Sequence, residues 1–209
     1  MDEWIDILDE HGEKTGDVSL KSEAHQAGLW HRCFHCWIVC TDDSGATHLL
    51  AQRRSFDKDT WPGRLDVSVA GHLGAGEEPL DGRRELEEEI GLSVEPERLI
   101  PLGTRRVEHD IPQGRDREFH DVFLLLDRTP PSKLTRQKEE VDAIISIKLG
   151  DAVAMANGGT APATEHKDGE TSAIRISLPD FVLGSGGYIR DVVEAAERLL
   201  DGEKVGGIF

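Results

Sequence analysis

A nine-residue segment, residues 84–92, intersperses glutamates with aliphatic residues and follows a glycine-rich stretch. On an α-helix each residue advances by about 100°, so three of the glutamates lie within about 100° of one another. These three are Glu85, Glu88 and Glu89. Leu86 and Ile90 fall on a neighbouring side, where they can pack on a core. The segment therefore predicts an amphipathic helix that presents three carboxylates together and ends at Gly91 with a left-handed cap.

This concentration of negative charge needs a physical reason. Like charges three or four residues apart on a helix cost roughly 0.2–0.5 kcal/mol per pair. A hard divalent cation removes the repulsion, and Mg²⁺ commonly binds through one or two carboxylates together with substrate phosphates and water. The alternative is a solvated helix face with ion pairs to Arg83 and Arg84. The glycine-rich stretch and the terminal glycine favour the metal site.

Residues 71–92 resemble the signature of the Nudix hydrolase family, G-x5-E-x7-R-E-U-x-E-E-x-G-U, in which U is aliphatic. Gly71 and Glu77 fit its first half, and the residues from Arg84 to Leu92 fit its second half throughout. Six residues separate the halves here, where the family has seven. We interpret the difference as a one-residue deletion near Pro79, which sets Glu77 apart from the other matched positions.

The resemblance implies the Nudix fold, an α/β/α sandwich in which a mixed β-sheet lies between helices. It also implies a hydrolase that cleaves phosphoanhydride bonds with Mg²⁺, for which Mn²⁺ could substitute. Metal ions suit this chemistry because they neutralise the charge that builds on the phosphoryl oxygens. Arg84 is implied to orient the glutamates, and some family members place a general base where this chain has Glu139 and Glu140. The implied metal ligands are Glu85, Glu88, Glu89 and the carbonyl near Gly71.

A second resemblance, to the isopentenyl-diphosphate isomerase subgroup of the same superfamily, covers roughly residues 4–148. Residues 53–72 follow the isomerase pattern R-R-A-L-S-K-K-x-W-P-G-x-W-T-N-S-V-C-G-H without a gap. Ala70 stands where that pattern has its catalytic cysteine, and alanine can neither donate nor accept a proton. The sequence therefore favours a hydrolase on an isomerase-like scaffold. An isomerase and a catalytically inactive diphosphate-binding module stay as the alternatives.

The isomerase resemblance marks further candidate residues outside the glutamate segment. Cationic residues that hold a diphosphate match Lys21, Arg54 and Lys58, and Lys and Arg are the usual phosphate partners in proteins. Their alternative is solvated surface charge. A second metal site is implied by His25, His31, His72 and Glu118, and Glu118 is also a further candidate metal ligand in its own right. For each histidine alone, a satisfied core or surface position is the alternative.

A net charge of −17 over 209 residues argues against a nucleic-acid scaffold. We expect a small-molecule substrate instead, a nucleoside di- or triphosphate or another organic diphosphate. No run approaches the roughly 20 apolar residues that span a membrane. The acidic N-terminus also lacks the basic start of a signal peptide, so we expect a cytoplasmic protein with no membrane partner.

The three cysteines, Cys33, Cys36 and Cys40, lie close together in one segment. An odd count in a cytosolic chain argues against a disulfide framework. Cys33 and Cys36 with nearby histidines could bind zinc, but the segment is rich in the aromatic and branched residues of a strand. In a strand these two cysteines point to opposite faces, so we favour a buried strand.

Hydrophobic patterning predicts a single domain over residues 1–209 that begins with a β-hairpin. Strands are expected at residues 3–8, 15–20, 32–41, 47–53, 66–70, 99–109, 118–127 and 143–149. Helices are expected at residues 79–90, 151–157 and 188–200, with a flexible loop at residues 157–172. This order of elements favours a mixed sheet flanked by helices. The flexible loop and the last helix could serve a homodimer.

Overall fold

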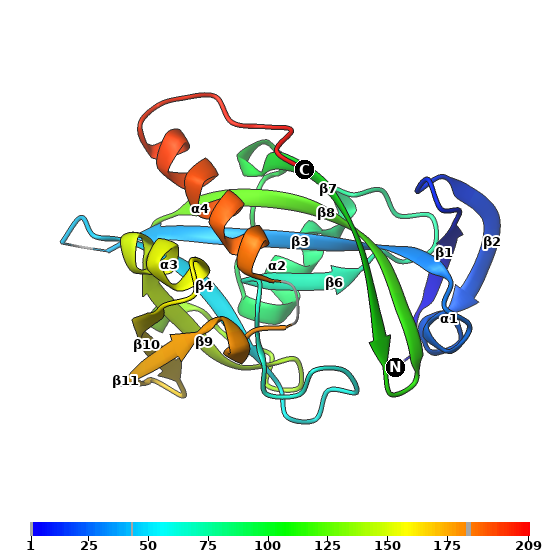
Figure 1. The fold of residues 1–209 in the computed structure, drawn as a ribbon, viewed down its shortest axis with the longest axis horizontal. Coiled ribbons are helices and arrows are strands. Elements are labelled where there is room, and N and C mark those ends of the chain that lie inside the picture. The colour runs from blue at the N-terminus through cyan, green and yellow to red at the C-terminus, as the bar shows by residue number, and fades with distance from the viewer. Residues whose placement is uncertain (1, 43, 183–184) are drawn as a thin grey trace.

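An 11-stranded sheet dominates the computed structural model, which describes residues 2–42, 44–182 and 185–209 (Figure 1). The strands are β1 (Trp4–Leu8), β2 (Lys14–Leu20), β3 (Trp30–Thr41), β4 (Thr47–Arg54), β5 (Leu65–Asp66), β6 (Val69–His72), β7 (Ile100–Ile111), β8 (Gly114–Asp127), β9 (Val141–Lys148), β10 (Thr160–Lys167) and β11 (Glu170–Ser177). The α-helices are α1 (Lys21–Ala27), α2 (Arg84–Ile90), α3 (Leu149–Ala156) and α4 (Ser185–Leu200).

Strand β3 organises the sheet, whose main order is β11-β10-β9-β4-β3-β1-β2. Strand β8 runs parallel to β3, whereas β4 and β6 run antiparallel to it, so the sheet is mixed as expected. Strand β7 pairs with β8, and β1 and β2 form the expected N-terminal hairpin. The predicted α/β fold class is confirmed.

The two faces of β3 bury different cores because successive side chains alternate across a strand. Phe34 and Cys36 pack with Leu86 of α2 on one face. Trp37 and Val39 pack on the other face, in a cluster that includes residues of α3 and α4. Figure 1 shows α2 behind the sheet and α4 in front of it. The sheet therefore lies between helical layers.

The predicted helix at residues 79–90 starts later than expected. A 3-10 turn at Asp81–Arg83 precedes α2, which begins at Arg84. Gly82 allows this turn to lie directly on the sheet, since a Cβ there would overlap the side chain of Phe34. The predicted strand at residues 66–70 is likewise divided into the short strands β5 and β6.

The expectation of a flexible loop at residues 157–172 is wrong, because β10 and β11 form a hairpin there. Asp168 and Gly169 turn the chain with φ of 51° and 82°, the positive values of a type I′ turn. Ala161 and Ala163 are buried, and β10 pairs with β9. Alanine and threonine concealed the alternation that a strand with larger apolar residues would show.

Helix α1 was not expected from the sequence, and it ends at Gly28 with a left-handed φ of 64°. The three cysteines are free and buried in β3, which confirms the buried-strand interpretation. In the described residues, no cysteine belongs to a cluster of potential metal ligands. No helix in these ranges is long and apolar enough to cross a membrane.

Candidate active site

The three candidate glutamates of α2, Glu85, Glu88 and Glu89, share one side of the helix but differ in burial. Glu89 is 3% exposed, whereas the side chain of Glu88 is 52% exposed. The carboxylate of Glu89 accepts hydrogen bonds from the backbone N–H of Ala70 and from Nε2 of Gln52, both at 3.3 Å. Glu89 thus joins α2 to β6 and β4, while Glu88 reaches toward solvent.

Gly71 lets a second glutamate approach the backbone of β6. A Cβ at this position would overlap the carboxylate of Glu85, so only glycine leaves room for it. The helix in turn ends where predicted, because Gly91 has φ of 70° and its N–H bonds to the carbonyl of Glu87. Glycine is therefore required at Gly71 to make room for Glu85 and at Gly91 to adopt a left-handed backbone conformation.

Arg84 forms hydrogen bonds with three of the acidic residues. Its Nε donates to Oε1 of Glu77 at 2.9 Å, and its Nη1 donates to Glu85 at 2.6 Å and to Glu88 at 3.2 Å. Nη2 donates to the backbone carbonyl of His72 at 3.1 Å. The shorter spacer therefore does not displace Glu77, whose carboxylate also accepts the N–H of Gly74.

Burial makes the ionised forms of Glu85 and Glu89 energetically unfavourable. Burial raises the pKa of Glu89 to about 8, and the neighbouring charge of Glu85 adds to this shift. Burial also raises the pKa of Glu85 to about 7, against the opposing effect of Arg84. A divalent cation would favour the ionised forms that burial disfavours, so this pair fits a metal.

Two of the predicted diphosphate-binding cations are committed to carboxylates. Arg54 lies 3.0 Å from Asp66, and Lys58 forms an ion pair with Glu140. Glu140, one of the two suggested general bases, is thereby neutralised, and its neighbour Glu139 is exposed. In the described part of the chain, the ammonium of Lys21 has no carboxylate in ion-pairing range, so Lys21 differs from the other two.

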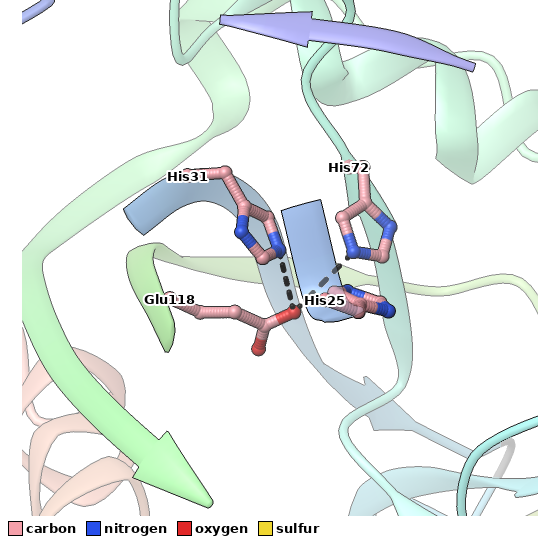
Figure 2. Close-up of side chains that lie close together, drawn as sticks. All are labelled: His25, His31, His72 and Glu118. Carbon is pink, nitrogen blue, oxygen red and sulfur yellow. Dashed lines mark ion pairs between the residues drawn. The ribbon is translucent and has the colours of Figure 1, made fainter. Parts of the chain in front are cut away.

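The structure brings all four members of the predicted second metal site together (Figure 2). One potential ligand atom from each lies within 4.8 Å of every other. Oε1 of Glu118 is 3.6 Å from Nε2 of His31 and 3.4 Å from Nε2 of His72. The residues come from α1, β3, β6 and β8, and they are His25, His31, His72 and Glu118.

The ring orientation of His31 favours a cation in this cluster. Its Nδ1 lies 3.0 Å from the carbonyl of Leu29 and donates to it. In a neutral imidazole, Nε2 then carries a lone pair that faces the carboxylate of Glu118. A backbone carbonyl is a usual hydrogen-bond partner for the ring nitrogen of a metal-binding histidine that does not bind the metal.

His25 and His72 are in the neutral form that binds metals. Burial lowers the pKa of His25 to about 4 and that of His72 to about 3, so both are neutral near pH 7. Their Nε2 atoms are buried and without a hydrogen-bond partner in the described residues, as is Nε2 of His31. Three unsatisfied imidazole nitrogens around one carboxylate fit a transition metal.

Sequence reasoning missed two residues of this cluster. Asp116 places Oδ1 3.5 Å from Nε2 of His25 and 3.7 Å from Nε2 of His31, and burial raises its pKa to about 8. His120 donates from Nε2 to Oε2 of Glu118 at 2.5 Å. Both sit two residues from Glu118 on β8. Strand alternation within the predicted strand would have indicated His120, and an earlier start of that strand would have indicated Asp116.

Comparison with known proteins gives consistent matches. The family model for the NUDIX domain matches residues 30–167. An uncharacterized Nudix hydrolase from Clostridium acetobutylicum is 38% identical over 202 residues, which cover 93% of this chain and 97% of that protein. Nudix hydrolase 3 from Arabidopsis thaliana is 39% identical over 148 residues, 68% of this chain and 19% of that protein. The solved structure of DR0079 from Deinococcus radiodurans has a TM-score of 0.55 at 25% identity, covering 79% of this chain and 93% of that one.

Proposed function

Because the chain belongs to the Nudix family and is a hydrolase acting on diphosphate bonds, we propose that it cleaves a nucleoside di- or triphosphate or another organic diphosphate with Mg²⁺. Mn²⁺ could substitute for Mg²⁺, since both accept carboxylate and water ligands. The proposed metal ligands are Glu85, Glu88, Glu89 and the carbonyl near Gly71. When bound, the ion neutralises charge on the phosphoryl oxygens and acidifies the attacking water.

One observation carries this proposal: Arg84 contacts two of the proposed ligands, Glu85 and Glu88, and the third, Glu89, is buried. The guanidinium contacts Glu85 and Glu88 through the same nitrogen and is itself fixed by Glu77. A residue held in this way orients carboxylates without competing for all of their oxygens. Arg84 is therefore a positioning residue in the proposed site, and Glu77 supports it.

We propose that Lys21, Arg54 and Lys58 hold the diphosphate. The positive charges of Lys58 and Arg54 act on Glu89 and lower its pKa against the larger effect of burial. Lys21 acts on the histidine cluster, where its charge lowers the pKa of His72 in the same direction as burial. These cations thus lie near the two clusters, where a phosphate would be bound.

The second metal site is a separate proposal. His25, His31, His72 and Glu118 would hold a metal, and Asp116 could supply a fifth ligand. Imidazole and carboxylate together suit Zn²⁺ or Mn²⁺ better than Mg²⁺. Glu118 contacts these histidines, so we propose it as a ligand here, not as a ligand of the metal on α2. The cluster and the match over residues 53–72 both support the isopentenyl-diphosphate-isomerase-like subgroup.

A phosphate-release screen tests the proposed hydrolysis. The panel would contain nucleoside di- and triphosphates, nucleotide sugars and prenyl diphosphates, each with Mg²⁺ and with Mn²⁺. Glu88→Gln should abolish release while leaving the fold intact, because Glu88 is exposed and, among the described residues, its carboxylate pairs with Arg84 alone. Glu87→Gln, an exposed change on the same helix, is the matched control. Full activity in the Glu88 variant would refute the glutamate assignment.

The two alternatives give different outcomes in the same screen. An isomerase would convert isopentenyl diphosphate to the dimethylallyl isomer without phosphate release, but Ala70 offers no proton-transferring group. An inactive binding module would bind diphosphates tightly and release no phosphate with any metal. Either result would overturn the hydrolase proposal.

We further propose that residues 1–209 form a single domain. The continuous sheet from β1 to β11 supports this, as does a core cluster that extends from β3 to α4. The suggested homodimer is a separate proposal, and sedimentation would test it.

A further inference from the structure

Four neighbouring strands carry a straight row of residues across one face of the sheet. Arg105 on β7 lies opposite His120 on β8, which pairs with Cys33 on β3, which pairs with His72 on β6. Residues that are opposite in register have side chains on the same face. Arg105 therefore shares a face with the histidine cluster, three strand spacings from β6.

The guanidinium of Arg105 is held in place by aromatic rings. Its Cζ lies 3.6 Å from the ring centroid of Tyr188 and 5.9 Å from that of Phe209. The hydroxyl of Tyr188 in turn lies 3.2 Å from Nδ1 of His35, whose ring stacks on His120 at 3.8 Å. These contacts fix the position of a cation beside the proposed metal site.

No carboxylate neutralises Arg105 within ion-pairing distance among the described residues. Burial lowers the pKa of Arg105 below its usual value. Tyr188 raises the pKa of Arg105, and so do two carboxylates that lie closer to other arginines: Asp66 is 3.0 Å from Arg54, and Asp191 is 3.7 Å from Arg190.

The other partly buried arginines of the described ranges behave differently. Each has a carboxylate oxygen within 3.0 Å, and they are Arg32, Arg53, Arg54, Arg84, Arg117 and Arg136. In a chain with a net charge of −17, carboxylates are abundant. An unpaired, partly buried and preorganised guanidinium therefore indicates that its anion comes from outside the chain.

We propose that Arg105 binds a second phosphate group of the substrate, a phosphate monoester separate from the diphosphate. The guanidinium fork matches the geometry of a phosphate, and the aromatic rings reduce the entropy lost on binding. Three strand spacings of about 4.8 Å place the Cα of Arg105 roughly 14 Å from that of His72. This inference rests on the proposed diphosphate hydrolysis and specifies its substrate class.

Pairs of diphosphates that differ only by a phosphate monoester provide the test. NADP and NAD form one such pair, and coenzyme A and dephospho-coenzyme A form another. The wild type should show a lower KM for the phosphorylated member of at least one pair. Arg105→Gln should raise that KM about 10- to 100-fold, as expected for a lost charge-assisted hydrogen bond, and leave kcat unchanged. The KM for the unphosphorylated member should not change.

Arg106→Gln is the matched control, because Arg106 is the next residue on β7, is exposed, and also stacks on an aromatic ring, that of Trp30 at 4.4 Å. It should leave both members unaffected. Arg105→Lys keeps the charge without the fork, so it should recover part of the preference. It also serves as the second variant if Arg105→Gln does not fold.

The inference and the proposed function fail in different ways. Hydrolysis of diphosphates with no preference for the phosphorylated members refutes the role of Arg105 and leaves the hydrolase intact. If no diphosphate is hydrolysed, the proposed function fails, and calorimetric binding of the same pairs tests Arg105 independently. Equal binding of the two members of each pair, or no binding of either, would refute the inference.

Discussion

Replacing Glu89 with glutamine should stabilise the metal-free protein at alkaline pH and at the same time abolish phosphate release. Glu89 is buried, and its pKa is raised from 4.5 to about 8, chiefly by burial. The folded protein therefore holds a proton that the unfolded chain releases at lower pH. The stability that protonated Glu89 contributes is fully present below about pH 4.5 and is lost as the pH rises through about 8.

The size of this effect follows from linkage. One pKa unit corresponds to about 1.4 kcal/mol of difference between the protonated and ionised states. A shift from 4.5 to about 8 then implies a loss on the order of 3 to 5 kcal/mol between pH 5 and pH 9. Domains are stable by only about 5–15 kcal/mol, so the loss is readily measured. Glutamine carries no charge at any pH, and its amide oxygen can accept the N–H of Ala70.

Urea unfolding in the presence of a chelator measures the difference directly. The wild type should lose stability between pH 5 and pH 9 relative to Glu89→Gln, and Mg²⁺ should restore stability to the wild type but not to Glu89→Gln. Glu87→Gln, an exposed change on the same helix, should follow the wild type. If the unfolding free energies of the wild type and Glu89→Gln change in parallel with pH, ionisation of Glu89 does not destabilise the folded protein, and the reasoning is refuted.

Three further predictions follow from the geometry. Gly71→Ala should lower phosphate release roughly 10²-fold by displacing the carboxylate of Glu85, with folding checked by thermal melting; full activity would contradict the close approach. His72→Asn should reduce bound Zn²⁺ or Mn²⁺ by one ion per chain after dialysis, as measured by elemental analysis, and an unchanged metal content would exclude His72 as a ligand. Gly169→Ala should destabilise the protein by roughly 1 kcal/mol in urea, because its φ of 82° suits glycine; a neutral result would contradict the type I′ turn.

Features that depend on local spacing were predictable from the sequence. The grouping of Glu85, Glu88 and Glu89 follows from the helical repeat, and the end of α2 follows from Gly91. The sequence could not predict which glutamate is buried. That depends on Gln52 and Ala70, which belong to strands that are placed over α2 only by the assembled sheet.

The missed features depend on contacts that are distant in the sequence, or on signals too weak to recognise. Asp116 lies in a polar stretch that resembled a loop, so the strand was expected to begin at residue 118 and to exclude it. The turn at Asp168 and Gly169 was a recognisable hairpin signal, but the small side chains of β10 concealed the strand before it. The ion pair of Lys58 with Glu140 joins residues 82 positions apart, and no local pattern indicates it.

Strand β6 explains why the two proposed metal sites belong to one functional unit. Its three successive residues Ala70, Gly71 and His72 contact different parts of the site: the N–H of Ala70 binds Glu89, Gly71 admits Glu85, and the carbonyl of His72 binds Arg84. The imidazole of His72 meanwhile points into the histidine cluster. Because a strand presents backbone groups at its edge and side chains on its faces, these three residues suffice to connect both sites. A metal that orders His72 would therefore also fix the carbonyl that positions Arg84, so occupancy of the histidine cluster should tighten Mg²⁺ binding at the glutamates, and by reciprocity the reverse.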